Sequence, residues 1–231
     1  MLKTKSMKYK VIITGSTGMV GKGILIECLE CDLIENVLVI NRSSINMNHT
    51  KLTEIILEDF NNLEEIRDEL VGYDGCFHSM GVSSLGVSKD VYENITYDVT
   101  IKLAKLFLEK NPNSTFTYVT GAGTDSTESG KIHWARIKGK TENELLRMPF
   151  KKSYMFRPGY IHPMKGVGSR TLWIQLLYKI IGVLYVFLKY FPSSATNTVN
   201  IGKAMICCLD RKMDIVILNN RDINKIASTY R

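Results

Sequence analysis

The chain has few of the residues that would support a disulfide scaffold, and no apolar signal segment near its start. Among 231 residues it has only five cysteines, an odd and scattered set that excludes a disulfide framework. A basic start leads directly into an apolar run at 10–15, with no signal-peptide core between them. We therefore expect a cytoplasmic protein whose thiols are reduced.

Signatures of nucleic-acid binding are lacking as well. The net charge of +7 is mild, and four of the lysines crowd the first ten residues, where they predict a solvated tail. No recognition motif accompanies this charge, so we expect no nucleic-acid partner. The positive balance instead favours an anionic ligand. The sequence predicts no metal site.

Seven short apolar runs alternate with helical segments along the chain. The runs lie at 10–15, 36–40, 52–57, 75–81, 114–123, 151–159 and 214–218. The helical segments lie at about 18–31, 61–70, 89–110 and 131–147, and a last one is expected after 194. This alternation predicts an α/β fold of the Rossmann type, a doubly wound parallel sheet of about seven strands. We expect one domain over 1–231, with 164–200 as a helical extension after strand six.

A glycine-rich loop, TGSTGMVG (14–21), joins the first strand to the first helix. Gly15 allows a tight turn, Gly18 lets a pyrophosphate approach the backbone, and Gly21 lets the helix pack closely. The free N–H groups at the start of the helix would then face the phosphates. The strand before the loop and the helix after it give the context that this motif requires. The loop therefore predicts a bound dinucleotide.

The end of the second strand lacks the acidic residue by which such sites bond the ribose of NAD. It reads Asn41-Arg42-Ser43-Ser44, and the planar guanidinium of Arg42 suits a 2′-phosphate. Arg42 as an ordinary surface arginine is the alternative. We expect NADP as the cofactor in preference to NAD, with Asp59-Phe60 beside the adenine.

Four motifs resemble those of the short-chain dehydrogenase/reductase superfamily. They are TGSTGMVG, FHSMG (77–81), the lysine of WARIKGKTE (134–142) and RPG (157–159). The chain is similar to the atypical members from about residue 9 to residue 218, including the epimerase-like and Tat-interacting-protein-like branches.

The resemblance implies a set of cofactor contacts. Lys138 would bond the nicotinamide ribose, and the segment after strand six would build a substrate lid. The pyrophosphate would be contacted by Gly15, Ser16, Thr17, Gly18, Met19 and Val20. The region between the adenine-side ribose and the nicotinamide would be lined by Ser79, Met80 and Gly81. The nicotinamide would lie against Pro158 and Gly159.

One catalytic residue of the resembling families is missing. They place a tyrosine four residues before the lysine, but Trp134 stands four before Lys138, and an indole has no useful acid function. Thr120 matches the hydroxyl residue that holds the substrate oxygen, and the hydroxyl-rich loop after it is expected to be mobile. In that loop Thr124, Ser126 and Thr127 are expected to serve turns or the next helix cap. Other possible proton donors are His78, His133, His162, Asp125, Tyr97 and Tyr160.

The segment 171–191 is the most apolar part of the chain. It has the length of a transmembrane helix, but Lys179 lies in its middle, at a cost of roughly 2.5–3.5 kcal/mol in a membrane. We interpret it as an amphipathic helix that serves as a lid over an apolar substrate, as a homodimer face or as a contact with a membrane surface.

These observations lead to one hypothesis and two rivals. The favoured function is an NADP-dependent oxidoreductase or a nucleoside-diphosphate-sugar-epimerase-like protein, acting on a small molecule that is apolar or nucleotide-linked. Lys138 would orient the cofactor, and Trp134 would replace the usual acid or stack on the substrate. The first rival is a non-catalytic NADP(H)-binding regulator. The second is a peripheral membrane protein that uses 171–191.

Overall fold

A parallel sheet of seven strands forms the centre of the molecule. The computed structural model describes residues 7–167, 193 and 195–230. The strands follow the order β3-β2-β1-β4-β5-β6-β9, and every neighbouring pair is parallel. Their bounds are β1 (Tyr9–Thr14), β2 (Ile34–Asn41), β3 (Leu52–Ile56), β4 (Gly75–His78), β5 (Thr115–Val119), β6 (Lys152–Arg157) and β9 (Ile217–Asn219). The predicted fold class is thereby confirmed.

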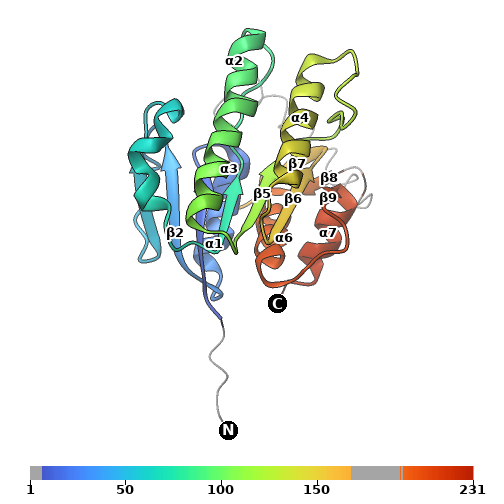
Figure 1. The fold of residues 1–231 in the computed structure, drawn as a ribbon. Helices are drawn as coiled ribbons and strands as arrows, with labels where there is room; N and C mark the ends of the chain where they lie inside the picture. Colours follow the sequence, from blue (N-terminus) through green and yellow to red (C-terminus); the bar gives the residue numbers. More distant parts are fainter. Residues whose placement is uncertain (1–6, 168–192, 194, 231) are drawn as a thin grey trace.

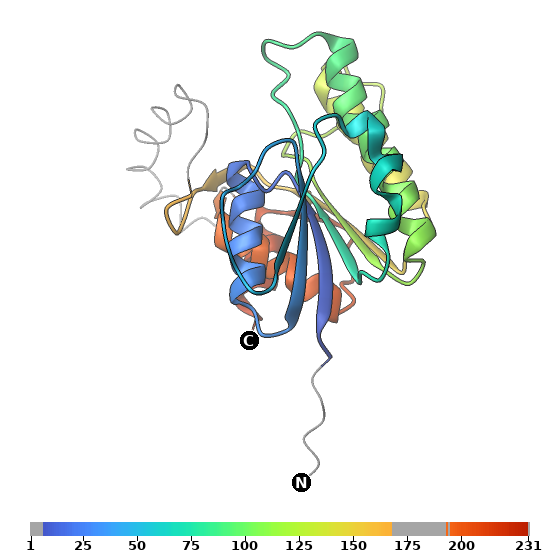
Figure 2. The same ribbon diagram turned by 90° about the vertical axis from the view of Figure 1, so that its left-hand side faces the viewer.

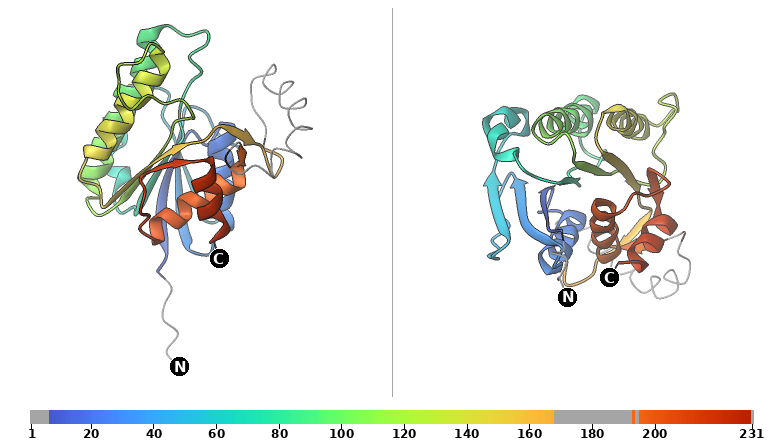
Figure 3. Two further views of the ribbon diagram at one scale, coloured as in Figure 1. Left: turned by 90° about the vertical axis from the view of Figure 1, so that its right-hand side faces the viewer. Right: turned by 60° about the horizontal axis from the view of Figure 1, so that its bottom comes forward.

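Helices cover both faces of this sheet, as Figure 1 and the right-hand view of Figure 3 show. One layer contains α1 (Met19–Glu30), α6 (Thr198–Asp210) and α7 (Asn220–Ser228), which pack on one another in that order. The opposite layer contains η1 (Phe60–Leu70), α3 (Val99–Lys110) and α4 (His133–Arg147), seen on the right of Figure 2. The sheet is therefore the middle layer of three.

The strand sequences are apolar on both faces because each face is covered. In β1, Val11 and Ile13 belong to the core beneath α1 and α6, whereas Ile12 belongs to the core beneath α3 and α4. All three side chains are fully buried. Successive residues of a strand point to opposite faces, so a central strand between two helical layers needs an unbroken apolar run.

Three details differ from the sequence-based prediction. The predicted helix 89–110 is α2 (Lys89–Glu93), a π-helical turn η2 (Asn94–Asp98) and then α3. The last strand begins at Ile217 instead of 214, since its register with β6 starts at the pair Met155 and Ile217. A second sheet of β7 (Tyr160–His162) and β8 (Ala195–Asn197) was not expected, nor was α7.

The interpretation of 171–191 as lid, dimer face or membrane contact lies outside the described residues. Within the described ranges, no helix is both long enough and apolar enough to cross a membrane.

Candidate functional site

Three adjoining hollows follow the carboxyl ends of the central strands, where ligands of open α/β sheets bind. The outer hollow has a volume of about 420 Å³, the middle one about 120 Å³ and the inner one about 530 Å³. Met80 and Gly81, just after β4, line all three. We call the three together the groove.

The glycine loop forms the floor of the middle hollow, where Gly15, Thr17 and Gly18 line the surface. Gly15 has a φ of 78°, and a Cβ there would lie 2.7 Å from the Met80 nitrogen. A Cβ on Gly21 would lie 2.2 Å from the Gly15 carbonyl oxygen. Both positions therefore require glycine, one for the turn and one for the approach of α1 to the loop. The loop leaves an uncovered backbone cradle that fits a pyrophosphate.

The other residues of this loop that were predicted to contact the pyrophosphate do not all line the middle hollow. The Ser16 side chain is fully buried, and its hydroxyl donates to Asn41 Oδ1 at 2.9 Å. Only its backbone can therefore serve a phosphate. Val20 lines the inner hollow, and Met19 lines none of the three. Asn41 also donates to Glu54 on β3 at 3.0 Å, so its amide links the glycine loop to the neighbouring strand.

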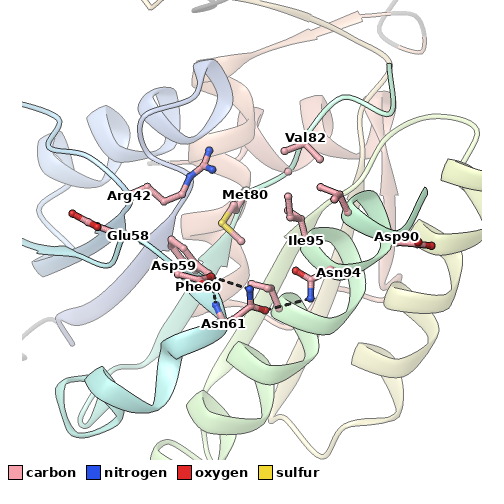
Figure 4. Close-up of a pocket in the computed structure, with 13 residues that line it drawn as sticks. Arg42, Glu58, Asp59, Phe60, Asn61, Met80, Val82, Asp90, Asn94 and Ile95 are labelled. Carbon is pink, nitrogen blue, oxygen red and sulfur yellow. Dashed lines mark hydrogen bonds between the residues drawn. The ribbon is translucent and has the colours of Figure 1, made fainter. Parts of the chain in front are cut away.

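The outer hollow holds the residues predicted beside the adenine, drawn in Figure 4. Arg42 and Phe60 line both this hollow and the middle one, so they lie where the two meet. Asp59 caps η1 by accepting from the Asn61 backbone at 2.9 Å. Asp59, Glu58 and Asp90 are the carboxylates among the lining residues, and Arg42 is the cation among them. No described residue forms an ion pair with Arg42.

The inner hollow collects the residues predicted at the reaction centre. Ser79 and Thr120 lie at the ends of strands β4 and β5, and Trp134 and Lys138 lie one turn apart on α4. Pro158 and Gly159, which follow β6, line the same hollow. Residues far apart in the sequence therefore meet in one cavity, although their roles stay predictions.

Lys138 is held at the base of the inner hollow. Its Nζ donates to the Thr120 carbonyl oxygen at 2.8 Å. Loss of hydration lowers the pKa of Lys138 to about 8, against a smaller opposing effect of the Glu142 carboxylate. At neutral pH the amine therefore still carries its proton, although less firmly than an exposed lysine does.

A buried ion pair behind Lys138 was not predicted from the sequence. Glu142 lies one turn further along α4 and is fully buried. The guanidinium of Arg157, at the end of β6, contacts both of its carboxylate oxygens and also the Ser126 hydroxyl. The Thr120 hydroxyl lies 2.5 Å from Glu142 Oε1. The spacing of Glu142 from Lys138 was the available signal, since residues four apart share one helix face.

Thr120 therefore differs from its predicted role in one respect. Its hydroxyl is directed at Glu142 and at the Phe156 carbonyl oxygen, 3.1 Å away. It faces into the protein and is already bonded there. Its backbone carbonyl, by contrast, directly holds Lys138.

The alternative proton donors do not line the groove. His78 is fully buried between the hydroxyls of Thr14, at 2.6 Å, and Thr100, at 3.0 Å. Burial lowers the pKa of His78 to about 3, with a smaller effect of Lys138. The structure therefore removes it from the candidates. His133, Asp125, Tyr97, Tyr160 and His162 are also absent from the lining of the three hollows.

The loop after Thr120 is held by hydrogen bonds within the loop and to α4. Asp125 accepts from the Thr127 hydroxyl and the Gly130 backbone, and Asn143 donates to the Ser126 carbonyl. A Cβ on Gly139 would lie 1.7 Å from the Asp125 carbonyl oxygen, so the loop and the helix touch backbone to backbone. The hydroxyls stabilise this turn, and none of them caps α4.

The chain matches no family model. It is 22% identical over 227 residues to protein FMP52, mitochondrial, of Meyerozyma guilliermondii, covering 96% of each chain. It is 25% identical over 159 residues to protein HTATIP2 of Rattus norvegicus, covering 68% of this chain and 64% of that protein.

Solved structures share the fold at low sequence identity. An ADP-L-glycero-D-manno-heptose-6-epimerase of Helicobacter pylori has a TM-score of 0.66 and 15% identity, over 98% of this chain and 83% of that one. A short-chain dehydrogenase/reductase of Saccharomyces cerevisiae has a TM-score of 0.66 and 12% identity, over 96% and 100%. A UDP-glucuronic acid 4-epimerase of Bacillus cereus, in complex with NAD, has a TM-score of 0.65 and 15% identity, over 91% and 76%.

The sheet order and the glycine-floored groove define a Rossmann-type protein with an NAD(P)-binding fold. Its relatives by sequence, together with the solved structures that share its fold, support a place among the atypical members of the short-chain dehydrogenase/reductase superfamily. The family resemblance predicted from the four sequence motifs is thereby confirmed.

The same relatives correct the expected location. FMP52 proteins from five fungi that match the chain are named as mitochondrial, which contradicts the prediction of a cytoplasmic protein. Reduced cysteines indicate a reducing environment but do not identify one compartment, so they could not support that prediction.

Proposed function

We propose that this protein binds NADP(H) along the groove and acts as an oxidoreductase on a substrate held in the inner hollow. A bound nicotinamide cofactor would supply or accept the hydride. The observation that carries the proposal is the continuity of the groove from Arg42, past the glycine loop, to Lys138. The residues that could hold a phosphate and those that could hold a ribose lie along it in the order of a dinucleotide.

Arg42 supports NADP in preference to NAD. It lies where the outer and middle hollows meet, and none of the described residues neutralises it by an ion pair. The position of a ribose-binding acid is taken by Asn41, whose amide is already bonded to Ser16 and Glu54. A 2′-phosphate would therefore meet a guanidinium that no described ion pair neutralises, while the nearby Glu54 carboxylate is already bonded to Asn41 and Ser44.

The test compares the two cofactors on one variant. Arg42→Asp should weaken NADPH binding by about ten- to a hundredfold, because a charge-assisted bond is lost, and should change NADH binding little. Arg221→Asp on α7 is the matched control, with the same charge change at an exposed position outside the groove. Calorimetric titration gives both constants. Equal weakening of NADPH and NADH would contradict the assignment of NADP.

A non-catalytic NADP(H)-binding regulator is the second candidate. It is supported by Trp134 in place of a tyrosine, and by the fact that Lys138 is the one titratable side chain among the described residues that line the inner hollow. Stoichiometric NADPH binding with no oxidation across a panel of carbonyl compounds and nucleotide sugars would favour this candidate. NADPH oxidation with any of them would exclude it.

A further inference from the structure

The inner hollow has apolar walls beyond the residues that could contact a cofactor. Val82, Val119, Ala122, Trp134 and Ile161 line this part of it. They come from the segment after β4, the end of β5 and the loop that follows it, α4 and β7. A ligand here would therefore contact apolar side chains on several sides.

The polar side chains of the inner hollow are directed into the protein. Ser79 Oγ donates to the Thr14 carbonyl oxygen at 2.9 Å, and the Thr120 hydroxyl lies against Glu142. Lys138 uses one of its N–H groups on the Thr120 carbonyl. The amine has two further N–H groups, since an ammonium carries three donors. One would suit a ribose hydroxyl and one a substrate oxygen.

We propose that the inner hollow takes an uncharged aromatic ketone or aldehyde, whose ring lies against Trp134 and whose oxygen accepts from Lys138. This inference rests on the proposed function and names its substrate class. A flat ring gains contact with the indole face, and the apolar walls need no polar partner from the ligand.

The same walls disfavour a nucleotide sugar, which is the substrate class of the epimerases that share the fold. Its pyrophosphate needs cations or several N–H donors, and Lys138 is the sole cation among the described lining residues. A phosphate placed against Val119 or Ile161 would lose water without gaining a partner. A carboxylate on the part of the ring that lies against these walls, away from Lys138, would meet the same penalty.

Three probes of matched design test the inference by calorimetric titration of the NADP⁺-loaded full chain. They are 2-acetonaphthone, its counterpart 6-acetyl-2-naphthoate, which carries a carboxylate at the far end of the ring from the ketone, and UDP-glucose. We expect the uncharged ketone to bind at least about tenfold more tightly than either anion. Binding of 6-acetyl-2-naphthoate or UDP-glucose as tightly as 2-acetonaphthone, or no binding of 2-acetonaphthone, would overturn the inference.

Cofactor binding is measured first and separately, so that the two proposals fail independently. Normal NADPH binding without ketone binding would refute the substrate class and leave the proposed function standing. Absence of NADPH binding would refute the proposed function. The ketone titration is repeated on cofactor-free protein, and it decides the substrate class in that case too.

Two variants assign the ketone to the inner hollow. Trp134→Ala should weaken ketone binding about tenfold by removing the stacking surface, whereas Val71→Ala, at an exposed site after η1, should leave it unchanged. Ala122→Lys adds a cation at an exposed position of the wall and should raise 6-acetyl-2-naphthoate binding about tenfold. Affinities for 2-acetonaphthone and 6-acetyl-2-naphthoate that stay at wild-type values in both variants would place the ligand elsewhere and refute the inference.

Discussion

Trp134 and Lys138 lie one helical turn apart on α4 and both line the inner hollow, and the proposed reductase function would place a tyrosine acid where Trp134 stands. Trp134→Tyr would bring a phenol to the same wall, where the ammonium of Lys138 lowers a phenol pKa toward neutrality. If the chain is a reductase without its acid, we expect turnover to rise about a hundredfold, measured as NADPH oxidation with 2-acetonaphthone. Trp134→Phe is the control, because it removes the indole without adding an acid. Equal rates for the two variants would mean that the acid is not the missing element.

No hydrogen bond joins Glu142 to Lys138, both of which lie within the described residues. Glu142 accepts from the hydroxyl of Thr120, whose carbonyl holds Lys138, and its charge acts on the Lys138 amine. The Glu142 carboxylate raises the pKa of Lys138 against the effect of desolvation, so Glu142→Gln should lower that pKa further below about 8. The measurement is the rate of Lys138 acetylation against pH by mass spectrometry, because only the neutral amine reacts. The curve should move to lower pH in Glu142→Gln.

The control for Glu142 is a glutamate of the same helix. Glu144→Gln removes a partly exposed carboxylate that pairs with Arg147 at 3.5 Å, and it should leave the acetylation curve unchanged. Glu142→Gln should also destabilise the fold by about 3 kcal/mol, because Arg157 is left as a largely buried charge without its partner. An unchanged acetylation curve in a destabilised Glu142→Gln variant would show that the residue is structural alone.

At the scale of elements, α4 and the loop of residues 121–130 behave as one unit because their backbones touch at Gly139. Replacing a helical glycine with alanine ordinarily stabilises a helix by about 1 kcal/mol. Gly139→Ala should have the opposite sign and cost about 1–3 kcal/mol, since a Cβ would overlap the Asp125 carbonyl oxygen. Gly121→Ala is the control, because a Cβ there meets its nearest atom at an ordinary 3.8 Å. Urea unfolding would contradict the close contact if Gly139→Ala were the more stable of the two.

The elements that could be predicted from sequence are those with a clear period or a clear end. β1 contains an unbroken apolar run, which predicts a buried strand. The glycine motif after it predicts a tight turn and then a helix, so these three elements could be predicted together. β7 and β8 pair through only three residues each, which is too short for a period to show. Glu142 could not be predicted as buried from its residue type, because its burial depends on Arg157 arriving from β6.

At the scale of the whole molecule, the groove exists because the topology brings β1, β4 and β5 side by side, with their carboxyl ends at one edge. Motif spacing predicted which residues gather there, since those ends are fixed by strand order. The direction in which each side chain points was not predictable, as Ser16 and Thr120 show: both turn their hydroxyls into the protein. Side-chain direction depends on partners from other elements, which a local motif does not contain.

His78 connects these layers, because its ring lies between Thr14 of β1 and Thr100 of α3 within the core. Desolvation lowers its pKa from an ordinary value of 6.5 to about 3, with a smaller contribution from Lys138, so the folded protein keeps the ring neutral. Below the unfolded pKa the unfolded chain binds a proton that the folded chain does not, and stability therefore falls as the pH falls from 6.5 toward 3. Between pH 7.5 and 5 this group should remove on the order of 2 kcal/mol from the free energy of unfolding. Urea unfolding at both pH values measures the loss, and His78→Asn, which cannot titrate, should show a loss smaller by that amount. An equal loss in both proteins would mean that the buried ring is not what links the stability of the fold to pH.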